Sequence, residues 1–125
     1  MVQAGDSNAL QRTALSYVSN QVRRGDAGGV AVMDFGGVPA LRLRETGADG
    51  TVYVTLIYCY DGQLRELYTE EGSGLTAADG LPILELDQLD LTVSGPLLHV
   101  TAREGASSWS TVLAPRTGVE EVAAS

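Results

Sequence analysis

The sequence predicts an α+β fold in which one N-terminal amphipathic helix packs on an antiparallel meander sheet of about seven or eight strands. Two observations predict it. A helical spacing of apolar residues is confined to residues 6–24, and from Gly29 onward apolar and polar residues alternate in short runs separated by turn-forming residues. The connections between these runs are too short for parallel crossovers, so neighbouring strands are expected to pair antiparallel.

The helix is predicted over residues 6–24 because its apolar residues recur on one helical face. One of the polar residues 6–8 can accept a hydrogen bond from a free N–H group at its start, and Gly25, after two arginines, favours its end. Such a helix must bury its stripe, and the sheet is the surface available for that. The stripe consists of Leu10, Ala14, Leu15, Tyr17, Val18 and Val22.

The strands are expected where β-rich runs stand between glycine-containing turns. The longest connection, residues 71–82, is rich in Gly, Ala and Asp, so we expect a surface loop with one helical turn at residues 76–79. The expected strands are residues 30–35, 39–45, 51–60, 63–70, 83–86, 89–93, 97–103 and 108–113. The body of the fold should be a single domain over residues 1–116, with residues 117–125 a disordered tail.

The run from Thr51 to Tyr60 is apolar in both of its alternating phases. A strand that is apolar on both faces is typical of the middle of a sheet covered on both sides. One face should lie under the helix, and the other should meet a crossing strand, a long loop or a partner protein.

Asp61-Gly62 follows this strand and predicts a tight hairpin, because a type I′ turn needs positive φ at both central residues. In that register Tyr60 lies opposite Gln63 and the flanking pairs follow, with Cys59 opposite Leu64, Tyr58 opposite Arg65 and Leu56 opposite Leu67. Arg65 is expected to stack on Tyr58 in a cation–π contact. A bulge or an edge position is expected for residues 63–70, because Leu64 and Leu67 then face opposite ways.

Composition excludes several classes of function. The formal net charge of −8 would repel nucleic-acid phosphates, so no nucleic-acid partner is expected. The single cysteine cannot form an intramolecular disulfide. No run approaches the roughly 20 apolar residues of a membrane helix, and the N-terminus lacks the apolar segment of a signal peptide. As given, the chain is expected to be soluble.

No residue is assigned as catalytic, cofactor-binding or metal-ligating, and no cofactor is expected. His99 lies on a strand whose other phase is apolar, so it should be structural or exposed. Cys59 should be a small core residue, because burial would raise the pKa of its thiol. The acidic loop at residues 70–79 is the best calcium candidate, but a solvated acidic rim is the favoured interpretation. The carboxylates considered were Glu66, Glu70, Glu71, Asp79, Glu85, Asp87 and Asp90.

Three segments carry a resemblance to a known family: RTALSYVSNQVRRGDAGG at residues 12–29, LIYCYDGQLREL at residues 56–67 and LPILELDQLDLTVSGPLLHVTAR at residues 81–103. Together they resemble an uncharacterised domain family of Gram-positive bacteria that is similar to type IV pilin or pseudopilin subunits. The resemblance implies a pilin-like fold, in which a membrane-spanning N-terminal helix continues into an amphipathic helix before an antiparallel sheet. It implies no catalytic residue.

From this resemblance we expect a non-enzymatic extracytoplasmic structural subunit at the cell surface or membrane-anchored, whose partners are other subunits of a pilus-like or secretion-like assembly. The chain departs from the family by lacking the hydrophobic N-terminal helix, which we attribute to truncation, so membrane contact would come only through that missing segment. The alternatives are a small ligand- or peptide-binding module and a carboxylate-based enzyme using Tyr58, Tyr60 or His99 in a cleft.

Overall fold

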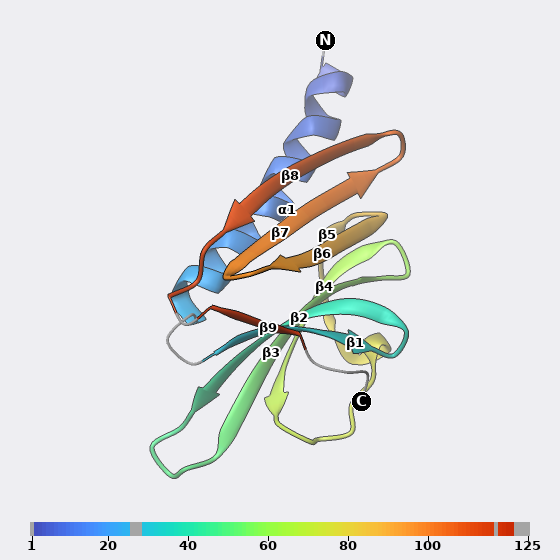
Figure 1. Cartoon of the computed structure of the whole chain (residues 1–125). Coiled ribbons are helices and arrows are strands. Elements are labelled where there is room, and N and C mark those ends of the chain that lie inside the picture. Colours follow the sequence, from blue (N-terminus) through green and yellow to red (C-terminus); the bar gives the residue numbers. More distant parts are fainter. Residues whose placement is uncertain (1, 26–28, 117, 122–125) are drawn as a thin grey trace.

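The computed structural model describes residues 2–25, 29–116 and 118–121, with the side chains of the helix described from Arg12 to Arg24. These residues form an α+β fold with one N-terminal α-helix and mostly antiparallel strands, as predicted (Figure 1). The strands are divided between two sheets, so the expected single sheet of seven or eight strands is wrong. The elements are α1 (Val2–Gly25), β1 (Val30–Phe35), β2 (Val38–Thr46), β3 (Val52–Tyr60), β4 (Gln63–Glu70), the 3₁₀ turn η1 (Ala77–Asp79), β5 (Leu81–Glu85), β6 (Gln88–Ser94), β7 (Leu97–Glu104), β8 (Ser107–Leu113) and β9 (Val119–Glu121).

Helix α1 begins at Val2, so the polar residues 6–8 lie inside it and are not its N-cap, contrary to the prediction. It ends at Gly25 after Arg23 and Arg24, as expected. The described part of the predicted stripe is confirmed, because Ala14 and Val18 are fully buried and Val22 nearly so. Leu10 lies outside the residues whose side chains are described.

Six strands form the larger sheet in the order β5-β4-β3-β2-β1-β9. All neighbours pair antiparallel except β9, which runs parallel to β1. The prediction of a disordered tail over residues 117–125 is therefore wrong for Val119–Glu121, which form β9. Residues 117 and 122–125 of that predicted tail lie outside the described residues.

The β3–β4 hairpin has the predicted register, with Tyr60 opposite Gln63 and Cys59 opposite Leu64. Asp61 and Gly62 have φ values of 55° and 74°, as a type I′ turn requires. The expected bulge lies on the other side of β4, where the pairing with β5 shifts between Leu64 and the next residue.

One detail of the hairpin prediction is wrong. The Arg65 guanidinium lies over the ring of Tyr60, 5.4 Å from its centroid, and not over Tyr58. Tyr58 is fully buried and its ring forms a T-shaped pair with the ring of Phe35, with the centroids 5.2 Å apart.

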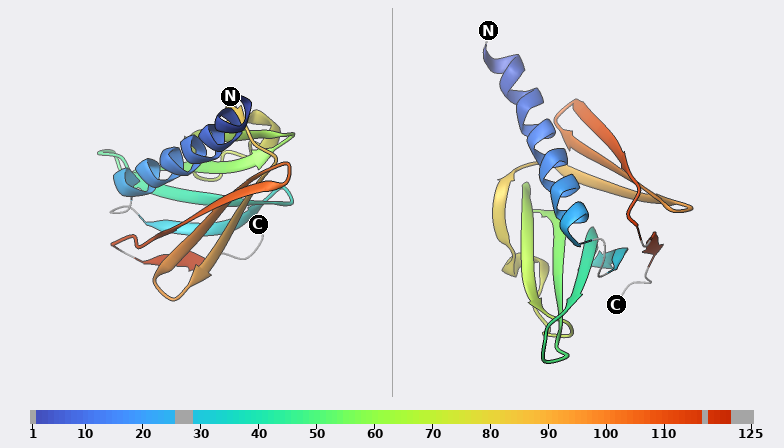
Figure 2. Two further views of the ribbon diagram at one scale, coloured as in Figure 1. Left: turned by 90° about the horizontal axis from the view of Figure 1, so that it is seen from above. Right: turned by 90° about the vertical axis from the view of Figure 1, so that its left-hand side faces the viewer.

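The smaller sheet has the strand order β6-β7-β8, and the chain passes to it from the larger sheet after β5. Between β5 and β6 stands Leu86, which is fully buried and anchors the crossover. The apolar phase of the small sheet faces the same core as α1, and α1 runs along both sheets (Figures 1 and 2). The apolar faces of both sheets must be buried, and the apolar stripe of α1 packs against both of them. The small-sheet residues in this core include Leu89, Leu98, Val100 and Ala102.

The larger sheet has two apolar faces, as the pattern of β3 predicted. On the helix side, Ile57 and Leu64 belong to the core shared with α1 and the small sheet. On the other side, Leu56, Tyr58 and Leu67 belong to a second cluster that includes Ala77 of the long β4–β5 connection. The long loop is therefore the cover on the second face, one of the three covers that the sequence left open.

The N-terminal turns of α1 extend past the edges of both sheets, whereas its C-terminal half lies against them (Figures 1 and 2). Among the described residues, no helix combines the length and apolar character needed to cross a membrane.

Candidate functional site

Cys59 is half-buried on the helix side of β3, and its Sγ donates a hydrogen bond to the Leu86 carbonyl oxygen at 2.7 Å. Burial, together with the nearby charges of Asp87 and Glu104, raises the pKa of the thiol from 9.0 to about 11. Since the thiolate is the reactive form, this environment disfavours a nucleophilic role. Cys59 therefore packs against the core, but it is half-buried and not one of the fully buried core residues.

His99 lies on β7, opposite Thr92 of β6 and Val112 of β8. Its neighbours along the strand, Leu98 and Val100, are fully buried, so His99 occupies the outer face of the small sheet and is partly exposed. Cys59 is on a different sheet and faces the core. The structure therefore does not bring Cys59 and His99 together.

The candidate carboxylates are dispersed and mostly serve local contacts. Glu66 accepts a hydrogen bond from the Tyr17 hydroxyl of α1, and burial together with this bond raises the pKa of Tyr17. Asp90 pairs with Arg103 at 2.6 Å, which lowers the pKa of Asp90. Asp79 accepts a hydrogen bond from the Thr76 backbone N–H at 2.7 Å and so closes the η1 turn.

The calcium hypothesis for residues 70–79 gains no support from this geometry. Within residues 2–25, 29–116 and 118–121, no three His, Cys, Asp or Glu side chains come close enough to hold a metal ion. Glu71 of this loop is engaged elsewhere, because its carboxylate pairs with Arg44 at 3.1 Å.

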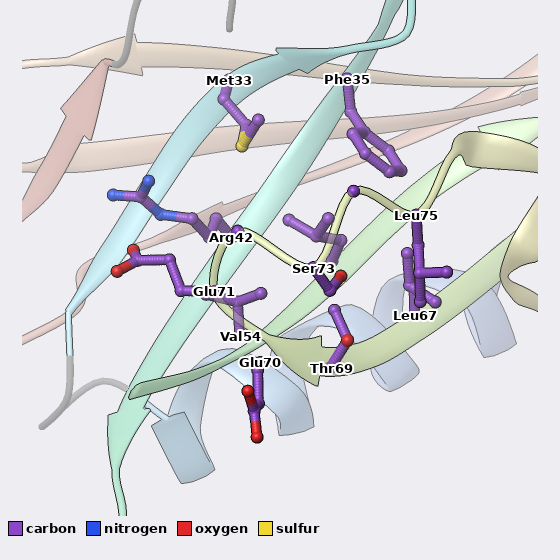
Figure 3. Close-up of a pocket in the computed structure, with 13 residues that line it drawn as sticks. Met33, Phe35, Arg42, Val54, Leu67, Thr69, Glu70, Glu71, Ser73 and Leu75 are labelled. Carbon is purple, nitrogen blue, oxygen red and sulfur yellow. The ribbon is translucent and has the colours of Figure 1, made fainter. Parts of the chain in front are cut away.

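A cavity of about 290 Å³ involves the start of this loop. It lies on the face of the larger sheet away from α1, between strands β1–β4 and the start of the β4–β5 connection (Figure 3). Its lining is largely apolar: Met33, Phe35, Val54, Leu56, Leu67 and Leu75, with Arg42, Thr69, Glu70, Glu71, Gly72, Ser73 and Gly74 completing it.

Strand alternation explains why these side chains converge. The pairing sets Arg42 opposite Leu56 and Leu56 opposite Leu67, so all three project from the same face of the sheet. Met33 pairs with Ala40 on the same face. The apolar phases of four strands thus form one continuous floor.

The far end of the loop is fixed above this floor. The Tyr58 hydroxyl donates to the Ala77 carbonyl oxygen at 2.6 Å, and Arg65 Nη1 donates to the Ala78 and Gly80 carbonyl oxygens at 3.2 and 3.3 Å. A Cβ atom at Gly80 would collide with the Tyr58 hydroxyl, so glycine is required there. The buried tyrosine of the hairpin therefore holds the loop down.

The electrostatics of the cavity differ from those of the whole chain. Arg42 lies at one end, and its Nε is buried without a hydrogen-bond partner among the described residues. Glu71 lies at the same end but pairs with Arg44. Glu70 belongs to the opposite phase of β4 and points away from the cavity (Figure 3). Two guanidinium groups therefore face one carboxylate.

Sequence reasoning missed this cavity. It predicted the two-sided β3 strand and the long loop, but not that the loop would leave space above the sheet. The sequence did contain one signal: Arg42 and Arg44 lie on the same face of β2 as Ala40, which is buried. Arginines in phase with core residues indicate a polar edge to an apolar surface.

The described residues define a small α+β domain with a loop-covered cavity. Residues 9–105 match the family model described as a domain of unknown function, DUF4860, and the chain belongs to this family. No curated protein and no solved structure matches the chain.

Proposed function

We propose that this protein is a non-enzymatic, extracytoplasmic, pilin-like structural subunit, tethered or assembled through a hydrophobic segment that precedes the chain. The observation that carries the proposal is the placement of α1. The helix is continuous from Val2 to Gly25, its C-terminal half is built into the core, and its N-terminal turns extend past the sheets (Figure 2). A preceding segment could join that end without crossing the folded body.

The packing of α1 also suits a subunit in which the helix links a membrane anchor rigidly to the folded domain. Ala14, Val18 and Val22 contact a core formed from both sheets, so the helix cannot move independently of either. Its other face carries exposed polar residues, among them Ser16 and Asn20. Such a face is available to neighbouring subunits.

Membrane fractionation of the complete reading frame tests the tether. The frame, with all codons upstream of Met1, is expressed in its native host with a C-terminal epitope, and a frame starting at Met1 is the control. We expect the complete product in the membrane fraction, released by detergent and not by salt, with its epitope open to protease on intact protoplasts. The proposal would be refuted if the upstream codons encode no apolar run of about 20 residues and the complete product is found in the cytosolic fraction.

Cysteine cross-linking in the same host tests the assembly. On a Cys59→Ser background, Ser16→Cys places a thiol on the exposed face of α1, and Ser94→Cys places one at the distant β6–β7 turn. We expect oxidant to give disulfide-linked multimers from the helix variant. Equal cross-linking from both variants would indicate random collision and contradict a helix-mediated assembly.

A second candidate, a small ligand-binding module, is favoured by the cavity of about 290 Å³. That volume lies near the lower end of the range for small-molecule pockets, about 300–1,000 Å³. The two candidates are compatible, because the cavity and the projecting end of α1 lie on different parts of the molecule (Figures 1 and 3).

A further inference from the structure

The loop-covered cavity carries an inference that goes beyond the subunit role and does not depend on it. Its floor consists of Met33, Leu56 and Leu67, and Leu75 of the loop forms part of its opposite side. Leu75 is 42% exposed, which leaves an apolar side chain at the mouth of an apolar space. Burying such surface is favourable, so an apolar group of matching size would gain free energy by entering.

The charge at the Arg42 end of the cavity restricts which polar group the apolar part of a ligand can carry. Arg42 Nε is removed from solvent yet has no hydrogen-bond acceptor among the described residues, an arrangement that costs free energy unless an acceptor arrives. Glu71 is already paired with Arg44 at 3.1 Å, so this end keeps an excess of one positive charge in a chain of formal net charge −8. A planar guanidinium matches the geometry of a carboxylate.

We propose that the cavity binds a small amphiphilic monocarboxylate, with its carboxylate at Arg42 and its apolar chain between the sheet floor and Leu75. The space of about 290 Å³ corresponds to roughly ten water volumes, which suits an unbranched acid of about ten non-hydrogen atoms. Octanoate is such an acid.

The covering segment has the backbone freedom to admit the ligand. Gly72 and Gly74 both have φ of 80°, a conformation that other residues rarely adopt. They lie between two fixed points, the Glu71–Arg44 ion pair and the Tyr58–Ala77 hydrogen bond. The segment at residues 72–75 can therefore shift over a bound chain while its ends stay in place.

Titration of the purified chain with three probes of the same tail tests the proposal. Octanoate, octanol and octylammonium are followed by calorimetry and by the methyl resonance of Met33. We expect octanoate to bind and to shift Met33, and octylammonium to bind about tenfold or more weakly, because it would bring a positive charge to Arg42. Octanol should fall between the two.

Matched variants assign the binding to the cavity. Arg42→Met keeps most of the aliphatic stem and removes the charge, and Arg103→Met makes the same change of net charge on the outer face of the small sheet. We expect octanoate affinity to fall about 10- to 100-fold in the first and to be unchanged in the second. If Arg42→Met does not fold, Arg42→Lys, which keeps the charge without the planar fork, should show a smaller loss.

The proposal is overturned if no probe binds, if the three probes bind equally, or if octanoate shifts resonances outside the cavity while Met33 stays unchanged. Equal loss in Arg42→Met and Arg103→Met would overturn it as well, because it would show a general charge effect. None of these outcomes bears on membrane tethering, which the fractionation experiment tests by itself.

Discussion

The two faces of the larger sheet are built from the same strands but are covered in different ways. On one face, α1 and the small sheet bring rigid apolar surfaces, and the resulting core contains many fully buried residues, such as Leu41 and Ile57. On the other face the cover is a glycine-containing loop, which seals only the part near Tyr58 and leaves a cavity above the rest. Regular elements fill space because their side chains recur at fixed spacing, whereas a loop covers only where individual bonds hold it.

Strand β4 offers the largest contrast between the two faces, because Leu64 and Leu67 lie three residues apart on opposite sides. Leu64 is fully buried in the helix-side core, while Leu67 lines the cavity. We expect Leu64→Ala to lower the free energy of unfolding by about 3–5 kcal/mol and Leu67→Ala by about 2 kcal/mol, since Leu67 already borders empty space. Urea denaturation measures both. Equal losses would show that the cavity closes in solution.

The anchor of the loop gives the next largest effect. Gly80→Ala places a Cβ against the Tyr58 hydroxyl and should cost about 2 kcal/mol in the free energy of unfolding. In a Tyr58→Phe background the hydroxyl is absent and the remaining close contacts are the ring Cζ at 3.0 Å and Arg65 Cβ at 3.2 Å, so the same substitution should cost less. This non-additivity, measured by a double-mutant cycle in urea, identifies the contact. Additive costs would place the strain elsewhere.

Tyr58→Phe alone should have a smaller effect. It removes the 2.6 Å hydrogen bond to the Ala77 carbonyl oxygen without removing the buried ring. We expect a loss of about 1 kcal/mol in the free energy of unfolding and faster amide hydrogen exchange confined to the β4–β5 loop. Tyr68→Phe, on an exposed ring, is the control and should change neither quantity. Faster exchange spread over the whole sheet would mean that Tyr58 supports the strands and not the loop.

The smallest expected effect concerns the helix-side face and pH. The pKa of Cys59 is raised from 9.0 to about 11, so the folded state keeps a proton that the unfolded state loses. The stability from this group is present below pH 9 and is lost as pH rises towards about 11. Cys59→Ser should flatten the fall in melting temperature over that window.

A thiol reagent at pH 8 should react at least about tenfold more slowly with the folded chain than with the chain in urea. Equal rates would contradict burial.

Local patterns predicted much of the fold. The eight strand runs and the β3–β4 register match the structure closely, since strand period, turn chemistry and chain length act between neighbours in sequence. The start of α1 was wrong because polar residues 6–8 resemble a cap, although they continue the helix from Val2. Strand β9 was missed because three residues carry little pattern, and its pairing with β1 is a long-range event.

The candidate site was less predictable than the fold. Cys59 and His99 could be assigned to strand phases from sequence, and each lies where its phase implies. The contacts of the long side chains could not be assigned from sequence. Arg65 lies over the ring of Tyr60 and donates to loop carbonyl oxygens, and it does not stack on Tyr58. Side chains of that length reach several neighbours at similar cost, so their choice depends on the complete packing.

The sequence by itself determined the order of helix and strands, the two-sided character of β3 and the hairpin at Asp61-Gly62. These follow from spacing and from backbone preferences that act over a few residues. Only the tertiary structure decided that the strands divide into two sheets around one helix, and that the loop leaves a cavity with Arg42 at its end. Both depend on which apolar surfaces, far apart in the sequence, pack against each other. That packing is decided only when the whole chain has folded.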